Sequence, residues 1–210
     1  LVVNAPGMST LAINTNEPQS PIKITVWKDS FDAQPVNEEA NQWFSEYLGL
    51  SVRLVKYTDI SHRQIDQNFA QPGQQVAFAD GFPVLVVHQA SLADLNQQLS
   101  EAVKMSRFRP NIVVASNQAA WDELNWSHLT TENLQLKLVK PCTRCVMTGV
   151  EQNSGHQTGT EVLKTLRQKF PHNNKAVFGI NAIPQINNSS EHLLNIGMRL
   201  KINENPNREA

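Results

Sequence analysis

The chain has 210 residues, of which 18% are charged, and its formal net charge is −1. This balance gives none of the basic excess that proteins binding nucleic acid need to neutralise phosphates. No apolar run reaches the roughly 18 residues that a membrane-spanning helix requires. We therefore expect neither nucleic acid nor a membrane as a partner.

The start of the chain, residues 1–7, has no positive charge and no long apolar stretch, so it differs from a signal peptide. It also lacks an initiator methionine, and we expect the sequence to be part of a longer one. The two cysteines, Cys142 and Cys145, fit a reducing compartment. Together these features predict a cytoplasmic protein.

The first 57 residues predict a small β-rich unit with one helix. Asn37 can cap a helix over residues 38–48, and Gly49 would end that helix. Three stretches alternate apolar and polar residues with the period of a half-buried strand: 11–13, 22–27 and 51–57. A turn containing Pro18 separates the first two. Residues 58–75 are rich in Gln, Asn, Asp, Pro and Gly and predict a surface connection, where we expect the domain boundary.

The remainder of the chain predicts several short strands and two further helices. Ser91 begins a capping box, which predicts a helix over 92–103, and Thr160 can cap another over 161–169. Four strands are predicted from apolar runs or alternation: 84–88, 112–115, 134–140 and 178–186. Gly179 within the last of them indicates a bulge or a close backbone approach. Many strands with three helices predict a mainly β, barrel-like α+β fold.

Both cysteines lie in one Cys-x-x-Cys motif, with Arg144 directly before Cys145. A neighbouring guanidinium favours the thiolate, which is the form that binds metals and attacks electrophiles. Residues 146–150 predict a strand, whereas a thioredoxin-type dithiol is followed by a helix. A zinc site would need a second Cys or His pair, and the histidines are scattered. A zinc module, a redox dithiol and two plain buried cysteines stay open beside a single functional thiolate.

Arg109 precedes the predicted strand 112–115 and is followed by Pro110. An arginine held in this way can present its planar guanidinium to a phosphate or to a pair of carbonyl groups. An internal ion pair to Asp or Glu explains the same position equally well.

Three blocks in this order resemble the MOSC domain, which is named after the C-terminal part of molybdenum cofactor sulfurases: FRPNIVV at 108–114, PCTRC at 141–145 and FGIN at 178–181. The nearer relatives are free-standing bacterial MOSC proteins and the mitochondrial amidoxime-reducing component. The resemblance implies a MOSC-type β-barrel preceded by part of an N-terminal β domain. The implied domains are residues 1–60 for that part, 61–204 for the MOSC domain and 205–210 for a loose tail.

The resemblance also implies a molybdenum cofactor, in which a pterin dithiolene holds one molybdenum. Cys145 is then the candidate metal ligand, because a soft thiolate suits a soft transition metal. Five further residues are candidates for binding the cofactor: Arg109, Asn111, Asp80, Thr143 and Arg144. The role of Cys142 stays open between a buried residue and a supporting one. The lysine, serine and arginine that grip the phosphate in the family have no match before residue 57, so we expect incomplete cofactor binding.

The implied reaction is the two-electron reduction of small N-hydroxylated substrates, with the redox chemistry supplied by the cofactor. A flavoprotein reductase or a ferredoxin-type protein would donate the electrons. The competing hypothesis is a carrier of the cofactor or of sulfur without turnover of its own. Pyridoxal phosphate enters only by association, because the same domain is fused to cysteine desulfurases that use it.

Overall fold

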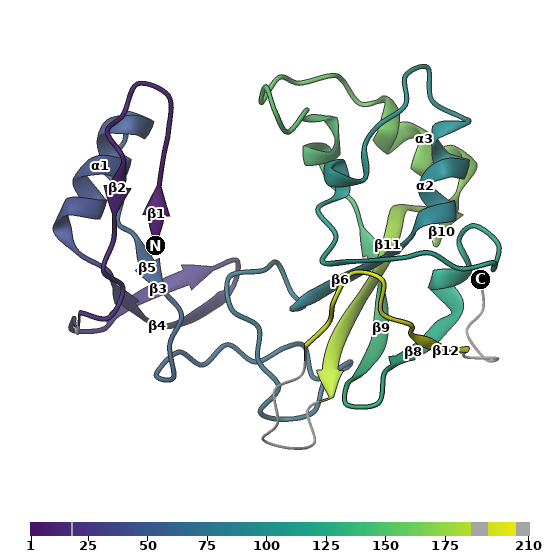
Figure 1. The fold of residues 1–210 in the computed structure, drawn as a ribbon, viewed down its shortest axis with the longest axis horizontal. Coiled ribbons are helices and arrows are strands. Elements are labelled where there is room, and N and C mark those ends of the chain that lie inside the picture. The colour runs from purple at the N-terminus through teal and green to yellow at the C-terminus, as the bar shows by residue number, and fades with distance from the viewer. Residues whose placement is uncertain (18, 186–192, 205–210) are drawn as a thin grey trace. The chain divides into compact units, whose positions relative to one another are not determined.

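A computed structural model describes residues 1–17, 19–185 and 193–204 (Figure 1). Its contacts divide the chain into two units, Leu1–Gly81 and Phe82–Ala210. The predicted turn residue Pro18 and the predicted tail 205–210 lie outside the described residues. No helix in the described ranges is long and apolar enough to cross a membrane.

The N-terminal unit contains two small antiparallel sheets and one helix. Its elements are β1 (Val2–Val3), β2 (Leu11–Ala12), β3 (Ile22–Val26), β4 (Asp29–Pro35), α1 (Glu38–Leu48) and β5 (Val55–Lys56). The cap predictions for α1 are confirmed. Asn37 Oδ1 accepts a hydrogen bond from Ala40 N at 2.9 Å, and Gly49 is left-handed with φ 65°.

The strand predicted over 51–57 is wrong for most of its length, since only Val55–Lys56 pairs with β4. Side chains of α1 bind the backbone before it: Val52 N donates to Ser45 Oγ at 3.0 Å, and Leu54 N donates to Asn41 Oδ1 at 2.9 Å. These bonds replace the partners that a neighbouring strand would provide.

Residues 61–81 pack with the N-terminal unit, although the predicted boundary lies at residue 60. Arg63 is only 3% exposed, and its Nε donates to Asp29 Oδ2 at 3.0 Å. The remaining guanidinium nitrogens donate to three carbonyl oxygens, those of Ala77, Ala79 and Asp80, at 2.6–2.9 Å. The polar composition of this segment predicted a surface connection, but its buried Arg63 side chain fixes the segment within the N-terminal unit.

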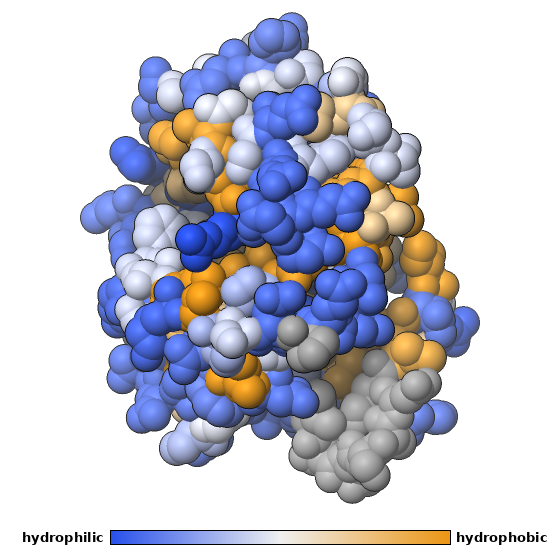
Figure 2. Space-filling view, turned by 90° about the vertical axis from the view of Figure 1, so that its left-hand side faces the viewer, coloured by the Kyte–Doolittle hydropathy of each residue, from blue (hydrophilic) through white to orange (hydrophobic). Residues whose placement is uncertain are grey.

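Surface exposure in this unit is uneven. Figure 2 draws one face of the whole molecule, which is mainly hydrophilic with hydrophobic patches between. The most exposed aromatic side chain of the unit is Trp27, at 75%, on the turn between β3 and β4.

The C-terminal unit is built on one larger sheet with the strand order β12-β8-β9-β11-β6-β7, and β10 pairs with β11 at the side. All described neighbours are antiparallel except β6 and β7. Its strands are β6 (Val84–His88), β7 (Ile112–Val114), β8 (Trp126–Thr130), β9 (Gln135–Thr143), β10 (Pro171–His172), β11 (Lys175–Gln185) and β12 (Lys201–Glu204). Its helices are α2 (Gln89–Asn96), α3 (Glu161–Lys169) and the 3₁₀ helices η1 (Met105–Phe108), η2 (Asp122–Asn125) and η3 (Val146–Gly149).

Two hydrophobic clusters lie on opposite faces of this sheet. One joins Leu95 of α2 and Leu166 of α3 to Phe178 of β11, and Figure 1 shows both helices near the same end of the sheet. The other draws apolar side chains from every strand between β12 and β7, which requires the sheet to curl around them. The predicted mainly β fold with three α-helices and a barrel-like sheet is confirmed.

The cap prediction for Ser91 is wrong. Helix α2 begins at Gln89, two residues before Ser91, and Ser91 is buried within the helix. Ser91 Oγ donates to Glu123 Oε2 at 2.6 Å and accepts from Trp121 N at 2.8 Å. Helix α2 also ends at Asn96, before the predicted end at residue 103. The side chain of Asn96 bonds both backbone groups of Val103, at 2.9 and 3.0 Å, and so closes the following loop.

Glu123 gives a test of this buried network. Burial raises the pKa of its carboxyl above the usual 4.5, and the hydrogen bonds from Ser91 and His88 oppose that shift only in part. A raised folded-state pKa means that the contribution of Glu123 to stability is complete below about pH 4.5 and is lost as the pH rises through the folded pKa.

We expect Glu123→Gln to lack this loss. The free energy of unfolding of the wild type should fall relative to that of the variant above about pH 4.5, by at most about 1.4 kcal/mol per pH unit for one proton. Denaturant unfolding at several pH values measures this difference. Parallel profiles for the two proteins would contradict it.

Candidate functional site

Residues 140–149, here called the cysteine segment, leave the sheet at the end of β9. Strand β9 continues through Cys142 to Thr143, which pairs with Val177 of β11. The strand predicted after Cys145 is wrong: η3 follows, and both N and Oγ1 of Thr148 donate to the carbonyl oxygen of Cys145, at 3.2 and 3.0 Å. Cys145 is exposed and its thiol is free.

Arg144 lies beside Cys145 in sequence but contacts the other cysteine. Its Nη1 donates to Cys142 Sγ at 3.0 Å, and its Nη2 donates to the carbonyl oxygen of Phe108 at 2.8 Å. The hydrogen bonds of this guanidinium therefore go to Cys142 and Phe108, and its expected effect on the Cys145 thiolate stays a prediction. Its Nε is buried and has no hydrogen-bond partner in the described part of the chain.

Residues 105–111, here called the arginine segment, contain η1 and lead into β7. Arg109 follows η1 in the left-handed region, with φ 53°, and its side chain is exposed. The ion pairs found between described residues are Lys23–Asp32 and Arg63–Asp29, and neither includes Arg109. Arg107, in contrast, is buried and donates to Thr158 Oγ1 at 3.0 Å.

The two segments meet over β11. Arg144 N donates to the carbonyl oxygen of Ala176 at 2.8 Å, and the ring of Phe108 stacks on Phe178 with centroids 3.8 Å apart. The structure therefore brings Cys145, Thr143 and Arg144 close to the backbone that carries Arg109.

Asn111 uses its side chain within the fold. Its Oδ1 accepts from Leu85 N at 2.8 Å, and its own N donates to the carbonyl oxygen of Leu85 at 3.0 Å. These two bonds fix the start of β6 against the entrance to β7. Because Oδ1 already accepts this hydrogen bond, the Nδ2 group is the part of the Asn111 side chain that remains to bind a ligand.

Asp80 belongs to the N-terminal unit. It is exposed, and its Oδ1 accepts from Trp27 Nε1 at 3.3 Å. Its backbone carbonyl accepts from Arg63, which fixes the peptide that carries the carboxylate.

Comparison with known proteins places this arrangement in a family. Residues 73–200 match the profile of the MOSC domain, and residues 1–51 match the MOSC N-terminal beta barrel domain. The chain belongs to the MOSC domain family. The match to residues 1–51 agrees with the expected N-terminal β domain.

Several curated relatives of this MOSC chain carry the name mitochondrial amidoxime-reducing component. Component 2 of Bos taurus is 34% identical over 173 residues, covering 80% of this chain and 51% of the relative. Component 1 of Mus musculus is 39% identical over 135 residues, covering 62% and 39%. Component 1 of Homo sapiens is 32% identical over 161 residues, covering 75% and 48%. The chain spans about half the length of the curated relatives or less.

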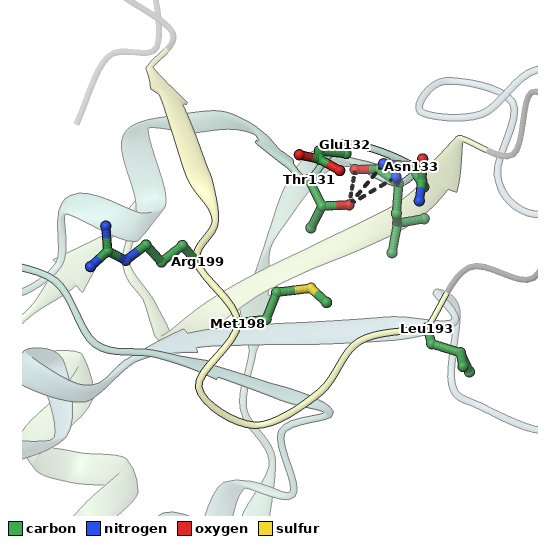
Figure 3. A pocket seen from close by; sticks show the side chains of 7 residues that line it. Thr131, Glu132, Asn133, Leu193, Met198 and Arg199 are labelled. Carbon is green, nitrogen blue, oxygen red and sulfur yellow. Dashed lines mark hydrogen bonds between the residues drawn. The ribbon is translucent and has the colours of Figure 1, made fainter.

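A cavity of about 260 Å³ lies elsewhere in the C-terminal unit, at the turn between β8 and β9 (Figure 3). Its lining residues are Thr131, Glu132, Asn133, Leu134, Leu193, Met198 and Arg199. The hydroxyl of Thr131 accepts hydrogen bonds from the backbone N of Asn133 and of Leu134. In Figure 3 the side chain of Arg199 points away from Thr131. None of these residues belongs to the cysteine or arginine segment.

Two observations beyond the predicted site residues bear on this region of the chain. Within residues 1–17, 19–185 and 193–204, no three side chains of His, Cys, Asp or Glu are grouped so that they could hold a metal ion. Val146 and Met147, directly after Cys145, are 60% and 61% exposed. The sequence analysis missed them because apolar residues after a strand predict a continued core.

Proposed function

We propose that this MOSC chain is a molybdenum-cofactor-binding domain of a reductase for N-hydroxylated substrates. The observation that carries the proposal is the exposed thiol of Cys145, held beside the arginine segment in a member of this family. The MOSC family is associated with the molybdenum cofactor, and the relatives are named for amidoxime reduction.

The groups that are free at this position fit such a cofactor. Cys145 offers one accessible thiol, as a ligand to a metal already held by a dithiolene requires. Arg109 offers an exposed guanidinium, and Arg144 Nε is a buried donor without a described partner. A buried donor of this kind is one that a bound acceptor can satisfy.

Each candidate would then have a distinct task. Cys145 would hold the metal, while Arg109 and the Nδ2 group of Asn111 would bind the anionic or polar edge of the cofactor. Thr143 would offer a donor beside the metal, and the role of Asp80, in the N-terminal unit, stays a prediction from the sequence. When bound, the cofactor supplies two-electron reduction of an N–O group.

Electrons would come from a partner protein, either a flavoprotein reductase or a ferredoxin-type protein. The substrate would be a small molecule with an N-hydroxyl group, and we place the protein in the cytoplasm. A free, exposed Cys145 also supports the second candidate, a carrier of the cofactor or of sulfur.

One experiment separates the two candidates. The chain is produced in a host that makes the cofactor, its molybdenum and pterin are measured, and an N-hydroxylated base is offered with a reduced donor. Turnover supports the reductase. A loaded chain that reduces nothing with any donor but transfers its cofactor to another apoenzyme supports the carrier. A chain without molybdenum contradicts the reductase and the cofactor carrier and leaves only the carrier of sulfur.

Arg109→Lys is expected to weaken cofactor retention although it keeps the positive charge. Lysine cannot make the two parallel hydrogen bonds of a guanidinium, and one charged hydrogen bond is worth roughly 1.5–3 kcal/mol, or about tenfold to 150-fold in affinity. Molybdenum content and the melting temperature of the cofactor-free chain are measured together. A lower melting temperature with unchanged retention would indicate an internal role instead.

A further inference from the structure

The cysteine and arginine segments are far apart in sequence, and no described strand pair joins them directly. Arg144 and Phe108 are 36 positions apart. Each segment rests on β11 through its own contact, the cysteine segment through Ala176 and the arginine segment through Phe178. Something further must set their distance if one ligand is to contact both.

The side chain of Arg144 spans this gap. One terminal nitrogen bonds Cys142 Sγ at 3.0 Å, the other bonds the carbonyl oxygen of Phe108 at 2.8 Å, and the guanidinium carbon lies 5.7 Å from the centre of the Phe108 ring. The fork of an arginine is planar and rigid, so two bonds in different directions fix its position. Hydrogen bonds from a charged donor are also stronger than neutral ones.

The bond to Phe108 acts on the conformation of Arg109. The carbonyl of Phe108 belongs to the peptide bond that leads into Arg109, whose φ of 53° lies in the left-handed region. That conformation is strained for a non-glycine residue and persists only where the surroundings hold it. The bond from Arg144 and the bond from Arg109 N to Ser106 O, at 3.1 Å, supply such support.

We propose that Arg144 and Cys142 are positioning residues, which set the arginine segment against the cysteine segment. The inference rests on the proposed function, because Cys145 and Arg109 are the groups that it would place around one ligand. Cys142 then serves as the sulfur acceptor that anchors the guanidinium, rather than as a metal ligand. Arg144 acts through Arg109 and Cys145 rather than by gripping the cofactor with its terminal nitrogens.

The first test uses the cofactor-free chain and amide hydrogen exchange. Arg144→Met should speed exchange about tenfold or more at two amides, Arg109 N and Thr148 N, which lie in different segments. Arg144→Lys should resemble it, because an ammonium cannot reach both acceptors in the same way. Arg63→Met, which removes a buried guanidinium from the N-terminal unit, should leave these two amides unchanged.

Cys142→Ala tests the anchor. It should speed exchange at the same two amides by a smaller factor, and the double variant with Arg144→Met should exchange no faster than Arg144→Met alone. If the effects of the two substitutions multiply, or if only the cysteine segment responds, Arg144 does not join the segments and the proposal is overturned.

The second test measures molybdenum per chain after production in a host that makes the cofactor. Arg144→Met should reduce molybdenum retention about tenfold or more. In a chain that already carries Arg109→Ala, the same substitution should reduce retention by a smaller factor, because part of the effect of Arg144 passes through Arg109. An equal factor in both backgrounds would indicate a general structural role and would contradict the proposal.

The two tests also separate this inference from the proposed function. If the wild type holds no molybdenum but the exchange pattern appears, the proposed function fails and the link between the segments stands. If the wild type holds molybdenum and Arg144→Met changes neither retention nor exchange at Arg109, the link fails and the function stands.

Discussion

Replacing Cys145 with serine is expected to abolish molybdenum retention while leaving the fold intact. Serine offers a hard oxygen in place of a soft thiolate, which lowers affinity for this class of metal. Loss of a residue that only supports a ligand costs roughly 10–100-fold in metal affinity, so loss of the ligand itself should exceed that range. Because the side chain is exposed, the free energy of unfolding should change by no more than about 0.5 kcal/mol.

Cys142→Ser is the matched control, since it removes the other thiol of the same segment. Its sulfur accepts a hydrogen bond from Arg144, and a serine oxygen can accept one as well. Retention should therefore fall less than in Cys145→Ser. Both variants are measured for molybdenum, pterin and unfolding midpoint. Equal losses of metal would instead point to a paired dithiol or a zinc site.

Local pattern predicted those elements whose stability comes from nearby residues. Helix α1 was predicted with its two caps because Asn37 and Gly49 act within a few positions of themselves. Strand β6 was predicted at Val84–His88 because an apolar run buried on both faces needs no knowledge of its neighbours. Helix α3 was likewise predicted over Glu161–Lys169, although Thr160 makes no side-chain cap bond there.

The errors arose where distant residues decide the local structure. Strand β4 was missed, because its sequence DSFDAQP has weak strand propensity and its register comes from pairing with β3. Ser91 looked like a helix cap, but its hydroxyl is held by Glu123, 32 positions away. In the candidate site, the resemblance implied Cys145 as the metal ligand, and the structure shows that this residue is exposed. The direction of the Arg144 side chain depends on Phe108 and could not be derived from spacing.

Gly179 is the position where a single methyl group should do the greatest damage to the fold. It lies in β11 at a register shift between Val177 and Ile180, as the sequence predicted for a bulge or a close approach. Its φ is 77°, and a Cβ there would lie 2.7 Å from the backbone oxygen of Val86 and 2.7 Å from a methyl carbon of Val87. Alanine at this position would therefore be strained in its backbone and crowded in its side chain. The backbone oxygen of Val86 cannot rotate away as a side chain can.

We expect Gly179→Ala to lower the free energy of unfolding by about 2–5 kcal/mol, from roughly 1–2 for the left-handed conformation and roughly 1–3 for overpacking. The control is Gly155→Ala, where φ is 70° and nothing lies within 4 Å, so only the conformational part applies. Denaturant unfolding of the cofactor-free chains gives both values.

Similar losses at the two positions would show that β6 moves aside and that crowding is relieved. A larger loss at Gly179 would show that β11 is a rigid support, and because Ala176 and Phe178 anchor the cysteine and arginine segments to that strand, molybdenum retention should fall with it.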